Sequence, residues 1–222
     1  MNDHLRLRID GSRPLSAETV AAVGAVCDAA EDGGARGPVV LELTGSPAGP
    51  GWTDGVTVGL VSKWERVLRR LERLPAVTVA IADGACGGAA LDALLATDLR
   101  VATRSLRLRL PALDGTTWPG MALHRLAQQA PGVASIRRAT LFGTPIDAAE
   151  ALTLRLIDEV ADDATAASAS AAGLAAGVNG PEMAIRRQLL LDAHSVPFEE
   201  ALGAHLAACD RALRRTAAEA PA

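Results

Sequence analysis

The sequence AVTVAIADGACGGAALDALLATD, residues 76–98, joins an apolar run, a glycine-rich turn and a small-residue helix in direct succession. The run at 76–82 is apolar almost throughout, and a strand of that kind is buried on both faces. Residues 83–88 turn the chain, and residues 89–96 have the composition of a short helix. This order predicts a parallel sheet covered by helices.

On either side of this segment the pattern continues in the same way. Leu5, Leu7 and Ile9 alternate with polar residues, which predicts a half-buried strand at an edge of the sheet. Further strands are predicted at 39–43, 98–103 and around 106–110, and helices at 16–33, 56–73, 89–96, from 119, and at 147–154, 164–176, 181–194 and 198–218. The alanine-rich helix at 164–176 is expected to be exposed or loosely packed. We predict an α/β core over residues 1–160 and a helical region over residues 161–222.

Composition excludes several classes of protein. The chain has 222 residues, a net charge of -4 and 2% aromatic residues, so it lacks the basic surface and stacking rings of a nucleic-acid binder. No apolar run reaches the roughly 18 residues of a membrane span, and the first ten residues do not form a secretion signal. Three well-separated cysteines argue against disulfides or a zinc site. We therefore expect a cytoplasmic protein without a metal, a membrane or a nucleic-acid partner.

Two glycine-rich connections offer places for chemistry. The turn at 83–88 lies between a buried strand and a helix, and amides at a helix start can hold a phosphate or a developing oxyanion. It lacks the spacing of a phosphate loop or a dinucleotide fold. The loop at 48–55 also joins a strand to a helix, so the two could direct two amides at one carbonyl oxygen. The alternative is that the first is only a tight crossing and the second a surface connection.

Asp92 is the candidate acid or base. It lies one turn into the helix that follows the glycine-rich turn, among alanines and leucines. If its carboxyl faces a pocket, burial raises its pKa toward the range useful for proton transfer. The alternative is a solvated first-turn acid that the helix dipole favours. No histidine has a partner at metal-ligand spacing, and no serine lies in a nucleophile elbow.

Several segments together resemble the enoyl-CoA hydratase/isomerase (crotonase) superfamily. They are 83–92 with 98–102, Pro111 with 119–122, 141–151 and 156–160, and the resemblance spans roughly residues 36–210. It implies the ClpP-like spiral of ββα units, an acyl-CoA substrate, and no cofactor other than the coenzyme A of that substrate. The resemblance also implies assembly into homo- or hetero-oligomers.

The resemblance also implies a site, position by position. The amides of Thr53 and Ala89 fall on the two oxyanion-hole donors, and Asp92 falls on the first catalytic glutamate. Ala112 falls on the second, and it cannot transfer a proton; Asp114 is the nearest carboxylate. The implied substrate contacts are Gly51, Trp52, Gly87, Gly88 and Ala112. A site with one carboxylate favours loss of water or isomerisation over hydration.

Within the superfamily, the chain looks most like the hydratase-like proteins of 3,5-dihydroxyphenylglycine biosynthesis, which serve glycopeptide-antibiotic pathways. That implies an enzyme that dehydrates and aromatises a CoA-linked polyketide intermediate toward 3,5-dihydroxyphenylacetyl-CoA. The alternative is a non-catalytic accessory subunit that stimulates a type III polyketide synthase or another crotonase-like protein. If the indole of Trp52 occupies the space between the two glycine-rich bends, no acyl-CoA site remains and the accessory role is the one left.

Overall fold

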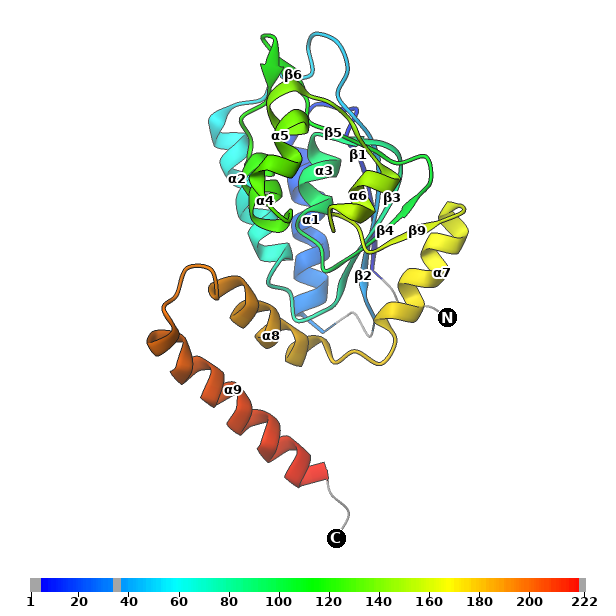
Figure 1. Cartoon of the computed structure of the whole chain (residues 1–222). Helices are drawn as coiled ribbons and strands as arrows, with labels where there is room; N and C mark the ends of the chain where they lie inside the picture. The colour runs from blue at the N-terminus through cyan, green and yellow to red at the C-terminus, as the bar shows by residue number, and fades with distance from the viewer. Residues whose placement is uncertain (1–4, 34–36, 220–222) are drawn as a thin grey trace.

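The computed structural model describes residues 5–33 and 37–219, so His4, Gly34 and the outermost ends of the two predicted regions lie outside it. Five strands lie side by side in the order β1 (Arg6–Asp10), β2 (Val39–Gly45), β3 (Thr78–Gly87), β4 (Leu99–Thr103) and β9 (Glu159–Ala161), and all four pairings are parallel (Figure 1). The first strand lies at an edge, as predicted. β5 (Arg107–Arg109) pairs with the end of β3 and with β8 (Ile146–Asp147), and β6 (Ala112–Leu113) forms a hairpin with β7 (Thr116–Thr117).

The helices follow the strands in alternation and then continue alone. They are α1 (Ala17–Glu31), α2 (Val58–Leu71), α3 (Ala89–Leu94), α4 (Met121–Gln129), α5 (Val133–Phe142), α6 (Ala148–Thr153), α7 (Ala164–Ala175), α8 (Gly180–Asp192) and α9 (Phe198–Glu219). Side chains that accept a backbone hydrogen bond cap the starts of α1, α2, α6, α7 and α8. The α/β core and helical C-terminal part that the sequence predicted are confirmed.

Strand β3 is buried on both faces because its side chains alternate between two hydrophobic clusters. Val79 and Ile81 belong to the cluster that includes the buried face of α7. Ala80 and Ala82 belong to the larger cluster formed with the helices of the other face. Helix α7 was expected to be exposed or loosely packed, and most of its residues are exposed, but three alanines spaced four residues apart bury one face of that helix. They are Ala167, Ala171 and Ala175.

The glycine-rich segment is mainly strand. β3 runs on to Gly87 because Ala85–Gly87 pairs with β5, so the turn predicted at 83–88 is confined to the end of that range. Gly88 makes the bend with φ of +52°, a conformation that a residue with a Cβ rarely adopts. The chain then enters α3 directly, which places the start of this helix at the carboxyl end of the sheet's longest strand.

The last two helices lead away from the core (Figure 1). Arg187 of α8 ties that helix to the body, since its guanidinium pairs with Asp98 at 2.6 Å and donates to the carbonyls of Leu74 and Ala76. An ion pair connects the two helices to each other: Glu182 of α8 accepts a hydrogen bond from Nε of Arg211 of α9 at 3.1 Å. Most of α9 remains exposed.

Candidate functional site

A pocket lies at the start of α3. Its walls come from α2, α3, α4, the loop after β2 and the segment after β7, and the space open to water-sized molecules is about 50 Å³. The chain has three tryptophans, and all of them, Trp52, Trp64 and Trp118, line this pocket. The pocket is therefore apolar, aromatic and narrow.

Asp92 is the carboxyl group of this pocket. It is half-buried in the first turn of α3, and it accepts a hydrogen bond of 3.0 Å from the indole Nε1 of Trp64, a fully buried residue of α2. Burial raises the pKa of Asp92 to about 6, the negative charge of Glu65 acts in the same direction, and the Trp64 hydrogen bond and the charge of Arg125 oppose them. A carboxyl group in this state exchanges protons near neutral pH. The structure thus places it in a pocket rather than on a solvated surface.

A second carboxyl group of the pocket was missed at the sequence level. Glu65 of α2 lines the pocket, and its Oε2 lies 2.9 Å from Nη1 of Arg125, a buried residue of α4. The same guanidinium pairs through Nε with Glu72 at 3.0 Å. Residues 65 and 72 are seven apart, so they lie on one face of a helix two turns apart. The sequence carries no signal for this role, because the spacing alone does not show that a buried cation of another helix lies beside the two acids.

The backbone of the glycine-rich bend lies close to side chains of the loop after β2. Gly88 and Ala89 line the pocket, and so does Pro47 from that loop. A Cβ on Gly88 would lie 2.9 Å from Cγ of Pro47, and one on Gly87 would lie 2.3 Å from Oγ of Ser46. The two bends therefore approach each other, and they do so through Ser46 and Pro47.

The remaining predicted residues lie around the pocket. Of the described residues, Gly51, Thr53, Gly87 and Ala112 are not among those that line it. The carbonyl of Thr53 accepts from the amide of Val56 at 2.9 Å, within the loop that leads to α2. The roles of the Thr53 and Ala89 amides as oxyanion donors remain predictions. Asp92, Trp52, Gly88 and Ala89 are the predicted residues that the pocket brings together.

Trp52 closes the pocket on the side of the β6–β7 hairpin. Its indole Nε1 donates to the carbonyl of Ala112 at 3.0 Å, and its ring meets that of Trp118 edge to face with centroids 5.4 Å apart. The side chain of Ala112 is exposed, and Asp114 lies exposed at the tip of the hairpin with φ of +50°. Trp52 and Trp118 therefore form the wall of the pocket that faces this hairpin.

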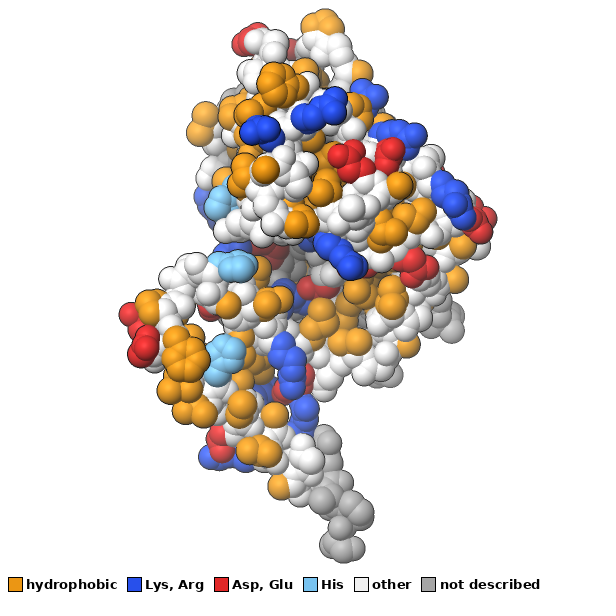
Figure 2. Space-filling view, viewed as in Figure 1, with side chains coloured by type: hydrophobic (Ala, Val, Ile, Leu, Met, Phe, Trp, Pro, Cys, Tyr) orange, Lys and Arg blue, Asp and Glu red, His pale blue; other side chains and the backbone are white. Residues whose placement is uncertain are grey.

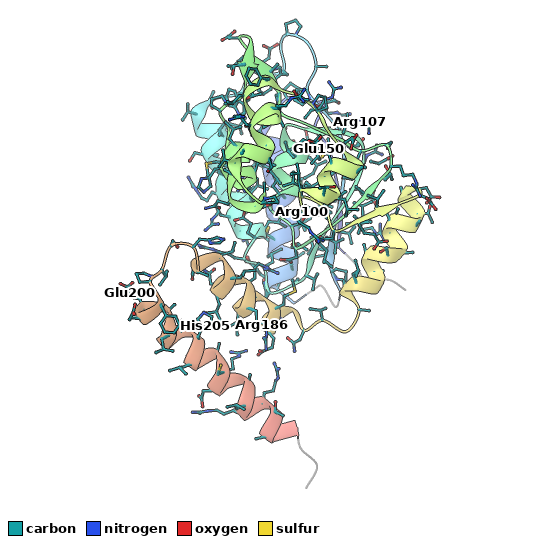
Figure 3. All side chains as sticks on the ribbon, in the orientation of Figure 1. Arg100, Arg107, Glu150, Arg186, Glu200 and His205 are labelled. Carbon is teal, nitrogen blue, oxygen red and sulfur yellow. The ribbon has the colours of Figure 1, made fainter. Side chains whose placement is uncertain are left out.

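Two further findings concern the chain as described. Within residues 5–33 and 37–219, no group of three His, Cys, Asp or Glu side chains is placed to hold a metal ion. None of the helices in these ranges has both the length and the apolar character needed to cross a bilayer. Figure 3 labels two arginines away from the pocket: Arg100 is partly buried and donates to Gln129 at 2.8 Å, and Arg107 is exposed and donates to the carbonyl of Leu106 at 2.7 Å.

The chain matches known proteins over most of its length. The family model for enoyl-CoA hydratase/isomerase matches residues 58–220. A protein from Amycolatopsis orientalis named as an enoyl-CoA hydratase is 58% identical over 217 residues, which is 98% of this chain and 99% of the relative.

Solved structures agree in fold. An enoyl-CoA hydratase from Shewanella pealeana has a TM-score of 0.80 at 18% identity, with 96% of this chain and 85% of that chain covered. An enoyl-CoA hydratase/isomerase from Marinobacter aquaeolei has a TM-score of 0.76 at 20% identity, with 100% and 90% covered. The predicted crotonase fold is confirmed, and the chain belongs to the enoyl-CoA hydratase/isomerase family.

Proposed function

We propose that this protein is an enoyl-CoA hydratase-type lyase that removes water from a CoA thioester, with Asp92 as the proton donor to the leaving hydroxyl. The observation that carries the proposal is the state of Asp92, a half-buried carboxyl whose pKa is raised to about 6 inside an apolar pocket. Such a group is a better acid near neutral pH than an exposed aspartate, which is already ionised.

The proposed substrate is a CoA-linked polyketide intermediate on the way to 3,5-dihydroxyphenylacetyl-CoA, in the biosynthesis of a glycopeptide antibiotic. Three indoles around one pocket suit a flat acyl group that becomes aromatic, because aromatic faces pack well on flat rings. Coenzyme A enters as part of this substrate and no separate cofactor takes part. Polarisation of the thioester oxygen by the amides of Ala89 and Thr53 belongs to the same proposal.

Asp92→Asn tests the proposal. The asparagine Oδ1 still accepts from Trp64, so acyl-CoA binding is expected to change little while the dehydration rate falls about 10²–10⁴-fold. The rate is measured as formation of the unsaturated thioester from 3-hydroxyacyl-CoA substrates, including the polyketide-derived one. Binding is measured by tryptophan fluorescence. Asp114→Asn is the matched control, since this exposed carboxylate lies outside the pocket. An unchanged rate in Asp92→Asn would eliminate Asp92 as the acid.

The small size of the pocket favours a second candidate. Trp52 lines the side on which the predicted second carboxylate is replaced by Ala112, and the free space of about 50 Å³ is small for an acyl chain. In this reading the protein is an accessory subunit that binds a type III polyketide synthase or a sister crotonase-like protein and raises its output.

Size-exclusion chromatography with the synthase separates the two candidates. Co-elution, together with full stimulation of the synthase by Asp92→Asn, supports the accessory role. Separate elution and loss of product formation in Asp92→Asn support the enzyme.

A further inference from the structure

The pocket holds two carboxyl groups, from two helices. Asp92 comes from α3 and Glu65 from α2, and both line the same narrow space. The two are linked electrostatically, since the charge of Glu65 is one of the causes that raise the pKa of Asp92. The tryptophan next to Glu65 in sequence, Trp64, hydrogen-bonds to Asp92, so one turn of α2 contacts the acid and carries the second carboxyl.

The surroundings of the two groups differ in charge. Glu65 forms an ion pair of 2.9 Å with Arg125, which is itself buried and pinned on its other side by Glu72. Asp92 receives one neutral hydrogen bond from an indole and lies in apolar surroundings. Glu65 is therefore held as one half of an ion pair, whereas the surroundings of Asp92 disfavour its charged form.

From this arrangement we infer that Glu65 is the base of the site and the partner of the acid Asp92, which restores the second carboxyl that Ala112 removes. This inference rests on the proposed function. In dehydration, the carboxylate of Glu65 takes the proton from Cα of the 3-hydroxyacyl thioester, and that electron pair forms the Cα=Cβ bond. The Cβ–O bond breaks, and Asp92 gives its proton to the departing oxygen, so water leaves. The site is reset when the proton on Glu65 is lost to solvent and Asp92 regains one.

The other charged and titratable groups that face Asp92 are few. Arg125 of α4 lowers the pKa of Asp92, and the thiol of Cys86 on β3 is buried beneath it. Arg13, from the loop after β1, lines the pocket, but its side chain is 83% exposed and pairs loosely with Asp10 at 3.6 Å. Glu65 is therefore the carboxylate whose removal changes the charge around Asp92 most directly.

The test compares Glu65→Gln with Glu72→Gln. Both substitutions remove one partner of Arg125, but Glu65 lines the pocket and Glu72 is not among the residues that do, within the described chain. We expect Glu65→Gln to reduce the dehydration rate about 10²-fold or more, with binding of the acyl-CoA retained. Glu72→Gln is expected to keep the rate within about threefold. Glu65→Asp keeps the charge and is expected to recover part of the rate.

A second readout does not depend on turnover. The indole N–H of Trp64 donates to Asp92, so its ¹H–¹⁵N resonance reports the titration of that carboxyl, and Asp92→Asn identifies the resonance by abolishing the titration. Glu65→Gln is expected to move the titration midpoint toward the ordinary aspartate value of about 3.9. Glu72→Gln is expected to leave it near the wild-type position.

The outcomes separate the inference from the proposed function. If Glu65→Gln and Glu72→Gln have the same dehydration rate and the same titration midpoint of the Trp64 resonance, Glu65 is only a structural partner of Arg125. That result would overturn the inference. A wild-type protein that dehydrates thioesters with Glu65→Gln equally active would have the same effect while the proposed function stands. A wild-type protein inert toward every thioester would overturn the proposed reaction and, with it, the role of Glu65 as the base, even if Glu65→Gln lowers the midpoint.

Discussion

At the scale of single residues, the side chain of Asp92 costs the fold stability in return for a useful pKa. Its pKa is about 6 in the folded chain against 3.8 for an unperturbed aspartate, mainly because burial disfavours the charged form. The folded protein therefore holds the proton more tightly than the unfolded one between these two values. The contribution of Asp92 to the free energy of unfolding is therefore fully present below about pH 4, and it is lost as the pH rises through about 6.

Asp92→Asn is accordingly expected to stabilise the protein at alkaline pH. The neutral amide keeps the Trp64 hydrogen bond and avoids a buried charge, so at pH 8 the free energy of unfolding should exceed that of the wild type by up to about 2–3 kcal/mol. At pH 4 the two proteins should be equally stable. Urea denaturation across this range checks the prediction, and a constant difference at all pH values would contradict it.

The same residues show how far the sequence reached. Asp92 was found because a carboxylate on a short apolar helix stands out in the linear pattern. Glu65 was not found, because an acid on an amphipathic helix has the same pattern whether it faces solvent or a pocket. Its meaning depends on Arg125, sixty residues later in the chain, and on the packing of α4 against α2 that brings the two within 2.9 Å.

At the scale of elements, the bend between β3 and α3 is the joint on which the site depends. The sequence predicted a strand, glycines and a helix in the right order, but it placed the turn too early. The pairing of Ala85–Gly87 with β5 extends the strand, and this pairing joins residues some twenty positions apart. Local composition carries no information about such a partner, so glycines that look like a turn become strand.

Gly88→Ala is expected to destabilise this joint more than a matched glycine elsewhere. The new Cβ would combine a positive φ with a contact of 2.9 Å to Pro47. Gly84→Ala is the control, because Gly84 has a similar φ of +67° and nothing within 4 Å of the added Cβ. We expect about 1–2 kcal/mol from backbone strain in both variants and a further about 1–3 kcal/mol in Gly88→Ala from overpacking. Denaturation midpoints measure the difference, and equal losses would show that the loop yields freely.

At the scale of the whole molecule, the apolar side chains of the core are buried, whereas those of α9 are largely exposed. The sheet and its helices enclose two hydrophobic clusters, while α9 extends from the body with apolar side chains along its length (Figure 2). Phe198 is 75% exposed and Leu213 is 70% exposed. A patch of this kind on a protein marks an interaction surface. The sequence predicted the helix itself, but one chain alone does not determine what covers it.

We expect α9 to mediate self-association through this apolar face. Leu202, Leu206 and Leu213 are exposed leucines on the helix, and the charged ties of α9 to α8 come instead from Arg211 and Arg215. Light scattering coupled to gel filtration should give a multiple of the 22.8 kDa chain mass for the wild type. Leu206→Lys with Leu213→Lys should give the monomer, because two charges in an apolar contact are costly to desolvate.

Ala204→Lys is the control for that experiment. Ala204 is also exposed, but it lies two residues from both Leu202 and Leu206, which places it on the opposite side of the helix. It adds a charge without entering the apolar face, so the oligomer should persist. A wild type that elutes as a monomer would contradict self-association. Equal dissociation by Ala204→Lys would show that added charge, rather than loss of the apolar contact, separates the chains.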